Sequence, residues 1–323
     1  MGAGVAFALT AGLMWGLVFV GPLLLPEYPP ALHTVGRYMA FGLIALPMAW
    51  WDRRELRRLT RADWTEALKL SAVGNLLYYM FLSSAIQRAG APLPTMIIGT
   101  LPVVIAITAN LRNPARDGQL PWRWLTPALL VILTGIACVN QVEFEALSRE
   151  SAAERSRYFQ GAMCALGAVA CWTWYPLRNG DWMRAHPDRN ARTWATAQGL
   201  TTLPLALLGY VVYLAWELAS SPAGAVVAPL GPRPWTFVGL MAAIGLFASW
   251  VGTLCWNAAS QRLPTALVGQ LIVFETLAAL LYAFLLRGTW PDGVALFGIG
   301  LLIAGVWGAV RIRPVREPVP TPD

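Results

Sequence analysis

Charge is what this sequence has least of. Of its 323 residues, 13% are Asp, Glu, Lys or Arg, about half of the ~25% that soluble globular domains carry. The charges are grouped, and the apolar runs between them are about 20 residues long, which is the length that crosses a ~30 Å hydrocarbon core. The composition therefore excludes a soluble enzyme, a disordered regulator and a nucleic-acid binder, and it predicts a polytopic membrane protein.

Residues for metal, redox and nucleotide chemistry are also scarce. The four cysteines fall inside apolar runs without a CxxC pair, and the two histidines, His33 and His186, have no ligand cluster around them. We therefore expect no disulfide, no metal and no cofactor. No GxxxxGK[ST] motif occurs, so ATP does not drive this protein directly.

The sequence has no Ser-His-Asp constellation or clustered carboxylates, which argues against a membrane enzyme. A membrane scaffold is the other alternative class.

Ten apolar runs predict an all-α membrane protein with ten transmembrane helices. Helices satisfy every backbone hydrogen bond within the segment, as the bilayer interior requires. The connections are about 18 residues or shorter, so we expect no soluble domain between them. The predicted spans are 3–25, 31–51, 65–87, 92–110, 122–140, 159–178, 193–217, 237–260, 264–286 and 292–311.

Arginine predicts the orientation, because cytoplasmic loops carry the excess of basic residues. Of the 23 arginines, Arg37 lies inside a span and 16 lie on one side of the membrane, while six lie on the other: Arg88, Arg149, Arg155, Arg157, Arg233 and Arg287. We therefore expect a multi-pass protein of a bacterial inner membrane with both termini in the cytoplasm. Tryptophans at the span ends are typical of an interfacial belt: Trp50, Trp51, Trp64, Trp122, Trp124, Trp182, Trp216, Trp235 and Trp290.

The two halves of the chain match each other at nearly constant offsets. The offset is 157 in the first two spans, 174 at the end of the third and 170 in the fourth and fifth. The matched residues are Trp15 with Trp172 and Gly42-Leu43 with Gly199-Leu200, then Gln87-Arg88 with Gln261-Arg262, then Pro94-Thr95 with Pro264-Thr265 and Gly135 with Gly305. Each half holds five spans, an odd number, so a duplicated chain must have halves of opposite orientation.

This duplication predicts two inverted five-helix repeats, the first over 1–140 and the second over 159–311. Residues 141–158 are expected to form a periplasmic linker, and residues 312–323 a cytoplasmic tail. Inverted repeats of this kind are an architecture of secondary transporters, whose substrate site lies near the bilayer midplane. A duplicated chain supplies both halves of the pathway, so a monomer suffices.

On these features the chain resembles the EamA-like branch of the drug/metabolite transporter superfamily, over about residues 3–311. The resemblance is carried by the repeated Trp15 and Trp172 helices, the Pro-Thr-x3-Gly openings at Pro94 and Pro264, and Glu275 in the ninth span. Within this branch, the chain is similar to bacterial aromatic amino acid exporters in its content of tyrosine and tryptophan. The resemblance implies export or facilitated diffusion.

Ionisable side chains inside spans are functional candidates, because each costs about 2.5–3.5 kcal/mol on insertion scales. Arg37 and His33, which lies one turn earlier in the second span, are the candidates to bind a substrate carboxylate, and the guanidinium of Arg37 has the better fork geometry. The alternative is an arginine that extends to the lipid headgroups. Glu275, near the centre of the ninth span, is expected to bind a substrate ammonium, to carry a proton, or to hold two helices together.

Polar side chains on the third and eighth spans predict the lining of a wet central cavity, and interhelical hydrogen bonding is the alternative. Trp172 and Tyr175 are three residues apart, so their rings share one helix face and offer an aromatic wall to a substrate. Ordinary packing is the alternative for these rings. The polar candidates are Asn75, Tyr78, Tyr79 and Ser83 on the third span, and Ser249, Thr253 and Asn257 on the eighth.

Proline and glycine mark predicted hinges in the fourth and ninth spans. Breaks of this kind let repeats rock around a fixed site, although most transmembrane prolines are tolerated kinks. The hinge candidates are Pro94, Gly99, Pro102, Pro264 and Gly269.

The sequence as a whole predicts a secondary transporter that exports amino acids, aromatic ones first, by alternating access. The alternative is an exporter of the same fold for another small metabolite or a cationic drug. The expected partners are a small-molecule substrate and the lipid bilayer, and nucleic acid is excluded.

Overall fold

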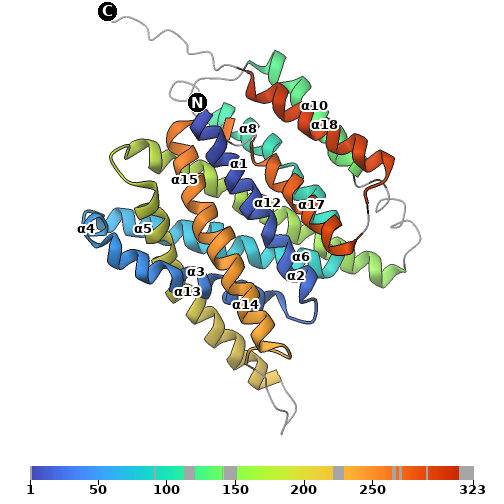
Figure 1. Cartoon of the computed structure of the whole chain (residues 1–323). Helices are drawn as coiled ribbons and strands as arrows, with labels where there is room; N and C mark the ends of the chain where they lie inside the picture. Colours follow the sequence, from blue (N-terminus) through green and yellow to red (C-terminus); the bar gives the residue numbers. More distant parts are fainter. Residues whose placement is uncertain are drawn as a thin grey trace, which may run out of the picture.

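The structure is a computed structural model that describes residues 2–90, 92–112, 121–139, 141, 151–220, 229–263, 267–268, 271–288 and 290–312. Within these ranges the regular secondary structure is helical and no strand is present. The predicted all-α class is therefore confirmed. Each of the ten predicted spans overlaps a helix or a run of consecutive helices (Figure 1).

The helices follow one another along the chain with short breaks. The first half contains α1 (Gly2–Gly16), η1 (Leu17–Phe19), α2 (Val20–Leu24), α3 (Pro30–Trp51), α4 (Arg53–Leu56), α5 (Arg61–Leu70), η2 (Ser71–Leu77), α6 (Tyr78–Ala89), α7 (Pro92–Gly99), α8 (Leu101–Arg112) and α10 (Trp122–Val139). The second half contains α12 (Ala152–Ala185), α13 (Ala191–Ser220), α14 (Pro234–Ile244), η3 (Gly245–Val251), α15 (Gly252–Arg262), α17 (Val273–Arg287) and α18 (Gly293–Val310).

Within the part of the chain that the structure describes, four continuous helical stretches are long and apolar enough to cross a membrane. They are Gly2–Leu24, Leu93–Arg112, Ala191–Ser220 and Pro234–Arg262. Shorter apolar helices cover Trp122–Cys138, Val273–Leu286 and Gly293–Gly305. Length and apolar composition thus give this chain the helices of a membrane protein.

α12 is longer than the span 159–178 that the sequence predicts. It has 34 residues, about 51 Å at 1.5 Å per residue, which exceeds the ~30 Å hydrocarbon core. A capping box starts it, in which the Ser151 hydroxyl accepts from the Glu154 backbone N–H at 3.3 Å. The extra turns hold charged residues such as Arg155 and Arg184, because these turns extend beyond the apolar run.

Helices from different parts of the chain pack in pairs. α3 packs along α13, and α10 packs along α18 at the upper right of Figure 1. α1 packs against α15 and α17, while α12 packs against α6 and α7. These contacts join the first half of the chain to the second throughout the bundle.

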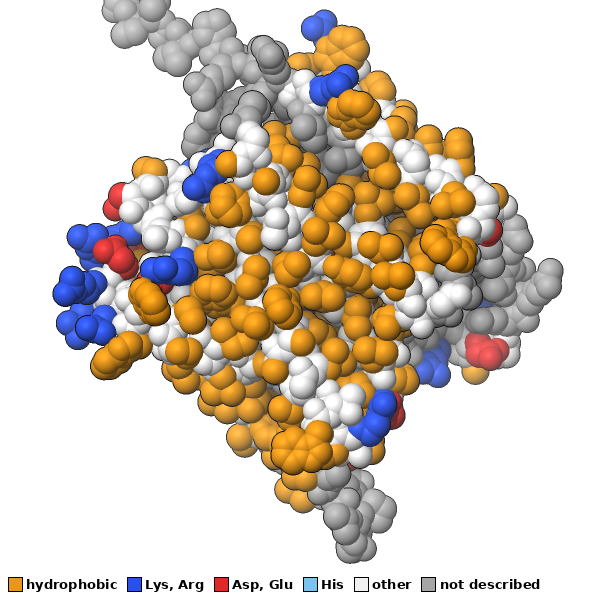
Figure 2. All heavy atoms as spheres, in the orientation of Figure 1, with side chains coloured by type: hydrophobic (Ala, Val, Ile, Leu, Met, Phe, Trp, Pro, Cys, Tyr) orange, Lys and Arg blue, Asp and Glu red, His pale blue; other side chains and the backbone are white. Residues whose placement is uncertain are grey.

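The surface of the bundle is apolar over its middle. Figure 2 shows hydrophobic side chains across the centre of one face, with basic and acidic side chains gathered at its edge over α4 and α5. Predicted belt residues such as Trp50, Trp235 and Trp290 are 74%, 87% and 95% exposed. Trp182, which the sequence assigns to the same belt, is instead buried between Trp194 and His186. The assignment of Trp182 was wrong, because position at a span end does not reveal which helices cover it.

Two stretches of π-helix interrupt the bundle. They are η2 (Ser71–Leu77) and η3 (Gly245–Val251), and each residue of η3 lies 174 positions after its counterpart in η2. This is the offset that relates Gln87-Arg88 to Gln261-Arg262. A π-helix widens the helical turn and frequently occurs at a functional site.

Candidate functional site

Arg37 on α3 is turned into the protein. Its side chain is 4% exposed, and its Nε donates to Ser249 Oγ of η3 at 3.0 Å. The guanidinium carbon lies 4.8 Å from the centre of the Tyr38 ring and 4.5 Å from that of Tyr79, in the range of cation–π attraction. Its Nη1 has no hydrogen-bond partner. Arg37 thus does not extend to the headgroups, and one donor of its fork is unpaired.

Glu275 on α17 is the second buried ionisable side chain of this region, at 1% exposure. Its carboxylate interacts with Trp172 and, electrostatically, with Arg37. Neither Glu275 Oε2 nor Trp172 Nε1 makes a hydrogen bond of good geometry. α1 lies directly against this site, since a Cβ on Gly12 would come within 3.0 Å of the Glu275 backbone nitrogen. Within the described residues, neither Arg37 nor Glu275 forms an ion pair.

Aromatic rings stack beside these two charges. Trp172 lies between Tyr78, with ring centres 4.5 Å apart, and Tyr175, with centres 4.9 Å apart and planes 3° from parallel. Trp15 meets the edge of Trp172 at 4.9 Å. The Tyr78 hydroxyl has no partner and interacts electrostatically with both Glu275 and Arg37. The stack and the two charges therefore belong to one region of the bundle.

Other polar candidates bond to neighbouring helices. Asn75 Nδ2 donates to Thr202 Oγ1 at 3.1 Å, and Asn257 Oδ1 accepts from Asn179 Nδ2 at 2.8 Å. Tyr79 donates its hydroxyl to the Val18 carbonyl at 3.1 Å. These three side chains make the interhelical hydrogen bonds that the sequence left open as the alternative to a wet lining.

Two further polar candidates, Ser83 and Thr253, are buried beside the central group. The Ser83 hydroxyl has no partner. Thr253 is 5% exposed and lies next to Tyr175. Together with the central group, they form a region that is closed to solvent rather than an open cavity.

His33 lies apart from the central group. Its Nε2 is 2.9 Å from the Leu25 carbonyl oxygen, and its ring packs against Tyr28 and Phe237. The structure therefore brings Arg37 together with Ser249 and Tyr79, and His33 together with the loop before α3.

Comparisons with known proteins agree with this architecture. The chain is 55% identical over 314 residues to inner membrane protein YtfF of Escherichia coli, and the match covers 97% of both chains. The EamA-like transporter family matches residues 2–113. The chain belongs to the EamA-like transporter family. It is a multi-pass protein of the bacterial inner membrane, as the sequence predicted.

The fold of this EamA-like transporter also occurs in a solved crystal structure of low sequence similarity. That protein is 17% identical, with a TM-score of 0.68, and the match covers 96% of each chain. At this identity the similarity concerns the fold alone.

The EamA-like transporter has a helix break at one predicted hinge. α7 ends at Gly99 and α8 starts at Leu101, while the Thr100 hydroxyl donates to the Ile97 carbonyl at 2.6 Å. Pro102 contributes to the break because it has no N–H to bond the carbonyl four residues earlier. Pro94 lies inside α7. Pro264 and Gly269 lie outside the described residues.

Sequence reasoning missed several polar residues next to the site. Gln198 Oε1 accepts from the Tyr175 hydroxyl at 2.8 Å, and Gln198 Nε2 donates to Asn179 Oδ1 at 3.1 Å. Asn179 also accepts from Trp194 Nε1 at 2.9 Å. The signal that could have identified Gln198 is its position as a polar residue inside an apolar span. No matching polar residue in the other repeat pointed to it.

Two apolar grooves open on the sides of the bundle instead. One, of about 490 Å³, lies between α1, α17 and α18, and another, of about 810 Å³, lies between α3, α6 and α13. Neither groove is lined by Arg37 or Glu275. Their apolar walls fit contact with lipid, and they do not hold the two charges.

Proposed function

We propose that this EamA-like transporter exports amino acids, aromatic ones in particular, across the inner membrane by alternating access. The observation that carries the proposal is a pair of buried opposite charges, Arg37 and Glu275, beside the Tyr78–Trp172–Tyr175 stack. Arg37 Nη1 is available to a carboxylate, and Glu275 Oε2 to an ammonium. A zwitterion with an aromatic side chain matches all three features.

We propose further that ten helices cross the membrane as two inverted five-helix repeats. The equal placement of η2 and η3 at offset 174 supports this, because chance does not repeat a rare π-helix at a sequence-derived offset. The contact between Trp15 and Trp172, themselves related by the duplication, is what a two-fold axis through the centre produces.

Reciprocal glycine contacts give independent support. A Cβ on Gly42 would lie 2.5 Å from Leu203, and a Cβ on Gly199 would lie 2.6 Å from Ala45. In the other pair of helices, Gly135 faces Leu302 and Gly305 faces Ile132 in the same reciprocal way. Small residues allow such close approach of transmembrane helices, and an inverted repeat makes it mutual.

The proposed orientation, with both termini cytoplasmic, agrees with the loop contacts. Arg233 pairs with Glu27 at 2.5 Å, and Arg157 donates to the Gln87 carbonyl at 2.9 Å. All four residues are assigned to the periplasmic side by the arginine distribution.

Alternating access is supported by the burial of the two ionisable side chains, because a substrate reaches Arg37 and Glu275 only when the helices around them separate.

The decisive experiment is counterflow in proteoliposomes without an ion gradient. We compare labelled tryptophan, phenylalanine, threonine and a quaternary ammonium dye, with wild type, Arg37→Ala, Glu275→Gln and the exposed control Arg54→Gln. We expect accumulation of the aromatic amino acids, a loss of about tenfold or more in either site variant, since each removes a charge-assisted bond, and no loss in the control.

Two results contradict the proposal. Unchanged tryptophan counterflow in both Arg37→Ala and Glu275→Gln removes the zwitterion site. Accumulation of the dye alone, with Glu275 indispensable and Arg37 expendable, favours the cationic drug exporter instead.

A further inference from the structure

Two chain segments meet at one end of the bundle, residues 52–66 from α3 to α5 and residues 178–192 from α12 to α13. We call their meeting place the arginine-rich end, because it holds Arg53, Arg54, Arg57, Arg58, Arg61, Arg178, Arg184, Arg189 and Arg192. The first segment belongs to the first repeat and the second to the other. Contacts between them therefore close the bundle between its two halves.

Two ion pairs join the segments. Arg192 Nε donates to Asp52 Oδ2 at 3.0 Å, and its Nη2 pairs with the other oxygen of the same carboxylate. Arg178 Nη2 donates to Glu66 Oε2 at 3.0 Å, and its Nε bonds Oε1. Both pairs have the two-pronged geometry that makes arginine–carboxylate contacts strong and specific.

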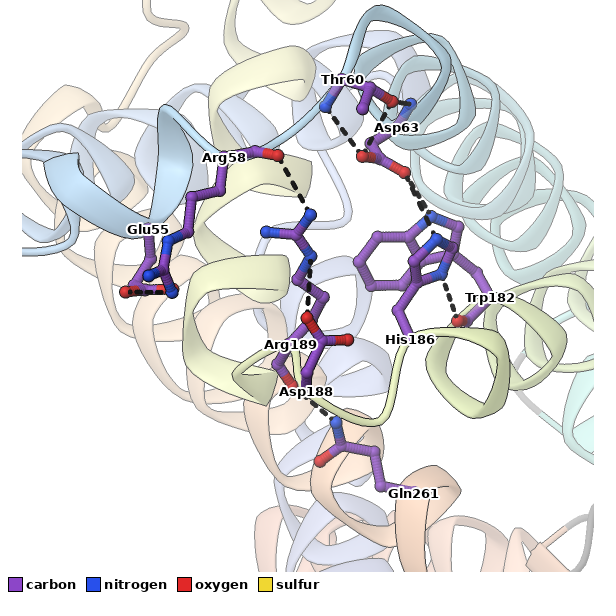
Figure 3. Close-up of polar contacts among 9 residues, drawn as sticks. All are labelled: Glu55, Arg58, Thr60, Asp63, Trp182, His186, Asp188, Arg189 and Gln261. Carbon is purple, nitrogen blue, oxygen red and sulfur yellow. Dashed lines mark hydrogen bonds and ion pairs between the residues drawn. The ribbon is translucent and has the colours of Figure 1, made fainter.

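Asp63, on the same segment as Asp52 and Glu66, makes a third connection between the two segments (Figure 3). Its Oδ1 accepts from Trp182 Nε1 at 3.0 Å, and His186 Nε2 lies 3.9 Å from the same oxygen. Nearby, Arg189 donates to the Arg58 carbonyl at 3.0 Å, and Gln261 of α15 donates to the Arg189 carbonyl at 2.8 Å.

The three carboxylates are buried, whereas the arginines that pair with Asp52 and Glu66 are 42% and 46% exposed. Asp52, Asp63 and Glu66 are 3%, 5% and 8% exposed. A buried carboxylate that loses its partner is strongly destabilised unless water replaces that partner. The contacts therefore permit two states of this end, one closed and paired, the other open and hydrated.

At the opposite end, an ion pair that the described residues form between the halves is Arg233 with Glu27, whose side chains are 48% and 35% exposed. An exposed pair contributes little, about 0–1 kcal/mol. Among the described residues, the buried carboxylates that pair across the two segments are thus concentrated at the arginine-rich end.

A continuous set of contacts connects this end to the aromatic stack. Trp182 stacks on Trp194 at 3.4 Å, and Trp194 donates to Asn179. Asn179 accepts from Gln198, which accepts from Tyr175 of the stack. A substrate that displaces the rings of the aromatic stack therefore also displaces side chains that contact Trp182, and so the contacts that close the arginine-rich end.

From these contacts we propose that Asp52 with Arg192 and Glu66 with Arg178, together with Asp63 and Trp182, form a gate that closes the arginine-rich end of the pathway during transport. The inference rests on the proposed alternating access. It adds two ion pairs and the carboxylate of Asp63, five charged gating residues that do not touch the substrate and whose contacts must separate once in each cycle.

The test measures access rather than transport. In a background without the four native cysteines, Ser71→Cys places a thiol at a fully buried position that bonds the Gln198 carbonyl between the gate and the stack. A membrane-impermeant maleimide is applied to each side of membrane vesicles separately. We expect Asp52→Asn with Glu66→Gln to raise the labelling rate about tenfold or more from the arginine-rich side alone, because the closed state loses both two-pronged arginine–carboxylate contacts.

Two further variants make the result specific. The charge exchange Asp52→Arg with Arg192→Asp is expected to return labelling toward the wild-type rate, because it restores the ion pair with its charges reversed. Glu55→Gln is the matched control, because it removes an exposed pair with Arg58 at the same end, and it leaves the rate unchanged. If the double variant does not reach the membrane, Glu66→Gln alone is compared with Glu66→Arg/Arg178→Glu.

Wild-type labelling in the neutralised variants overturns the gate, and so does an equal rise from both sides, which indicates general loosening. The assay needs no substrate. If tryptophan does not move in counterflow but the labelling rises as described, the amino acid proposal fails and the gate stands.

Discussion

At the scale of single residues, the site depends on polar atoms that the protein leaves unpaired. A buried polar group without a partner costs about 1–3 kcal/mol, so native proteins hold few of them. Arg37 Nη1 and Tyr78 Oη are of this kind, and Trp172 and Glu275 interact with each other without a hydrogen bond of good geometry. In the proposed site, the substrate supplies the partners that these groups lack.

Asp63 gives a prediction for pH dependence outside the spans. Burial raises the pKa of its carboxyl, but hydrogen bonds from the Thr60 backbone, Trp182 and the Thr60 hydroxyl outweigh burial and hold the pKa below the ordinary 3.8. Because folding lowers this pKa, the carboxylate stabilises the protein above pH 3.8, and that contribution is lost as the pH falls through the folded value.

We therefore expect Asp63→Asn to lower the thermal unfolding midpoint in detergent at pH 6, with the difference from wild type shrinking toward pH 3. The control is Asp188→Asn, whose side chain is 75% exposed and whose removal changes stability by less than about 0.5 kcal/mol. A difference that stays constant with pH contradicts the assignment.

At the scale of elements, the π-helix η2 brings its backbone close to the aromatic stack. A Cβ on Gly74 would lie 2.1 Å from Tyr175 Cδ2, and the nearest side-chain atoms of that ring are rigid. Only glycine fits at this approach. The position of the Tyr175 ring in the stack thus depends on the missing side chain at residue 74.

We expect Gly74→Ala to destabilise the protein by about 1–3 kcal/mol, as overpacking does, and to weaken tryptophan counterflow because the ring must move. Gly239→Ala in α14 is the matched control, since a Cβ there meets nothing within 4 Å. The measurements are thermal unfolding in detergent and counterflow. Equal behaviour of the two variants rules out the packing argument.

At the scale of the whole molecule, the proposed orientation makes a direct labelling prediction. Single cysteines replace Arg57, near the arginine-rich end, and Glu154, at the start of α12, in the background without native cysteines. We expect an impermeant maleimide added to intact cells to label Glu154→Cys, and to label Arg57→Cys only after permeabilisation, because basic loops stay cytoplasmic. The reverse labelling pattern places both termini in the periplasm, and the gate then closes the periplasmic end of the pathway.

Much of the fold was predictable because its signals are local. Apolar runs of about 20 residues predict helices, since a bilayer requires internal backbone hydrogen bonds. The all-α class, the family and the inner membrane location were confirmed. The lengths of α12 and η2 were not predictable in the same way, because caps and π-turns depend on a few side chains and on tertiary packing.

By itself, the sequence determined that this chain enters a membrane as helices and which side chains are expensive enough there to be candidates. Only the tertiary structure decided which of them meet. Arg37 and Ser249 are 212 positions apart, and Asp63 and Trp182 are 119 apart, so no local pattern pairs them. Such contacts depend on how closely helices approach, and that distance is set by small residues such as Gly74 and by the packing of every neighbouring helix.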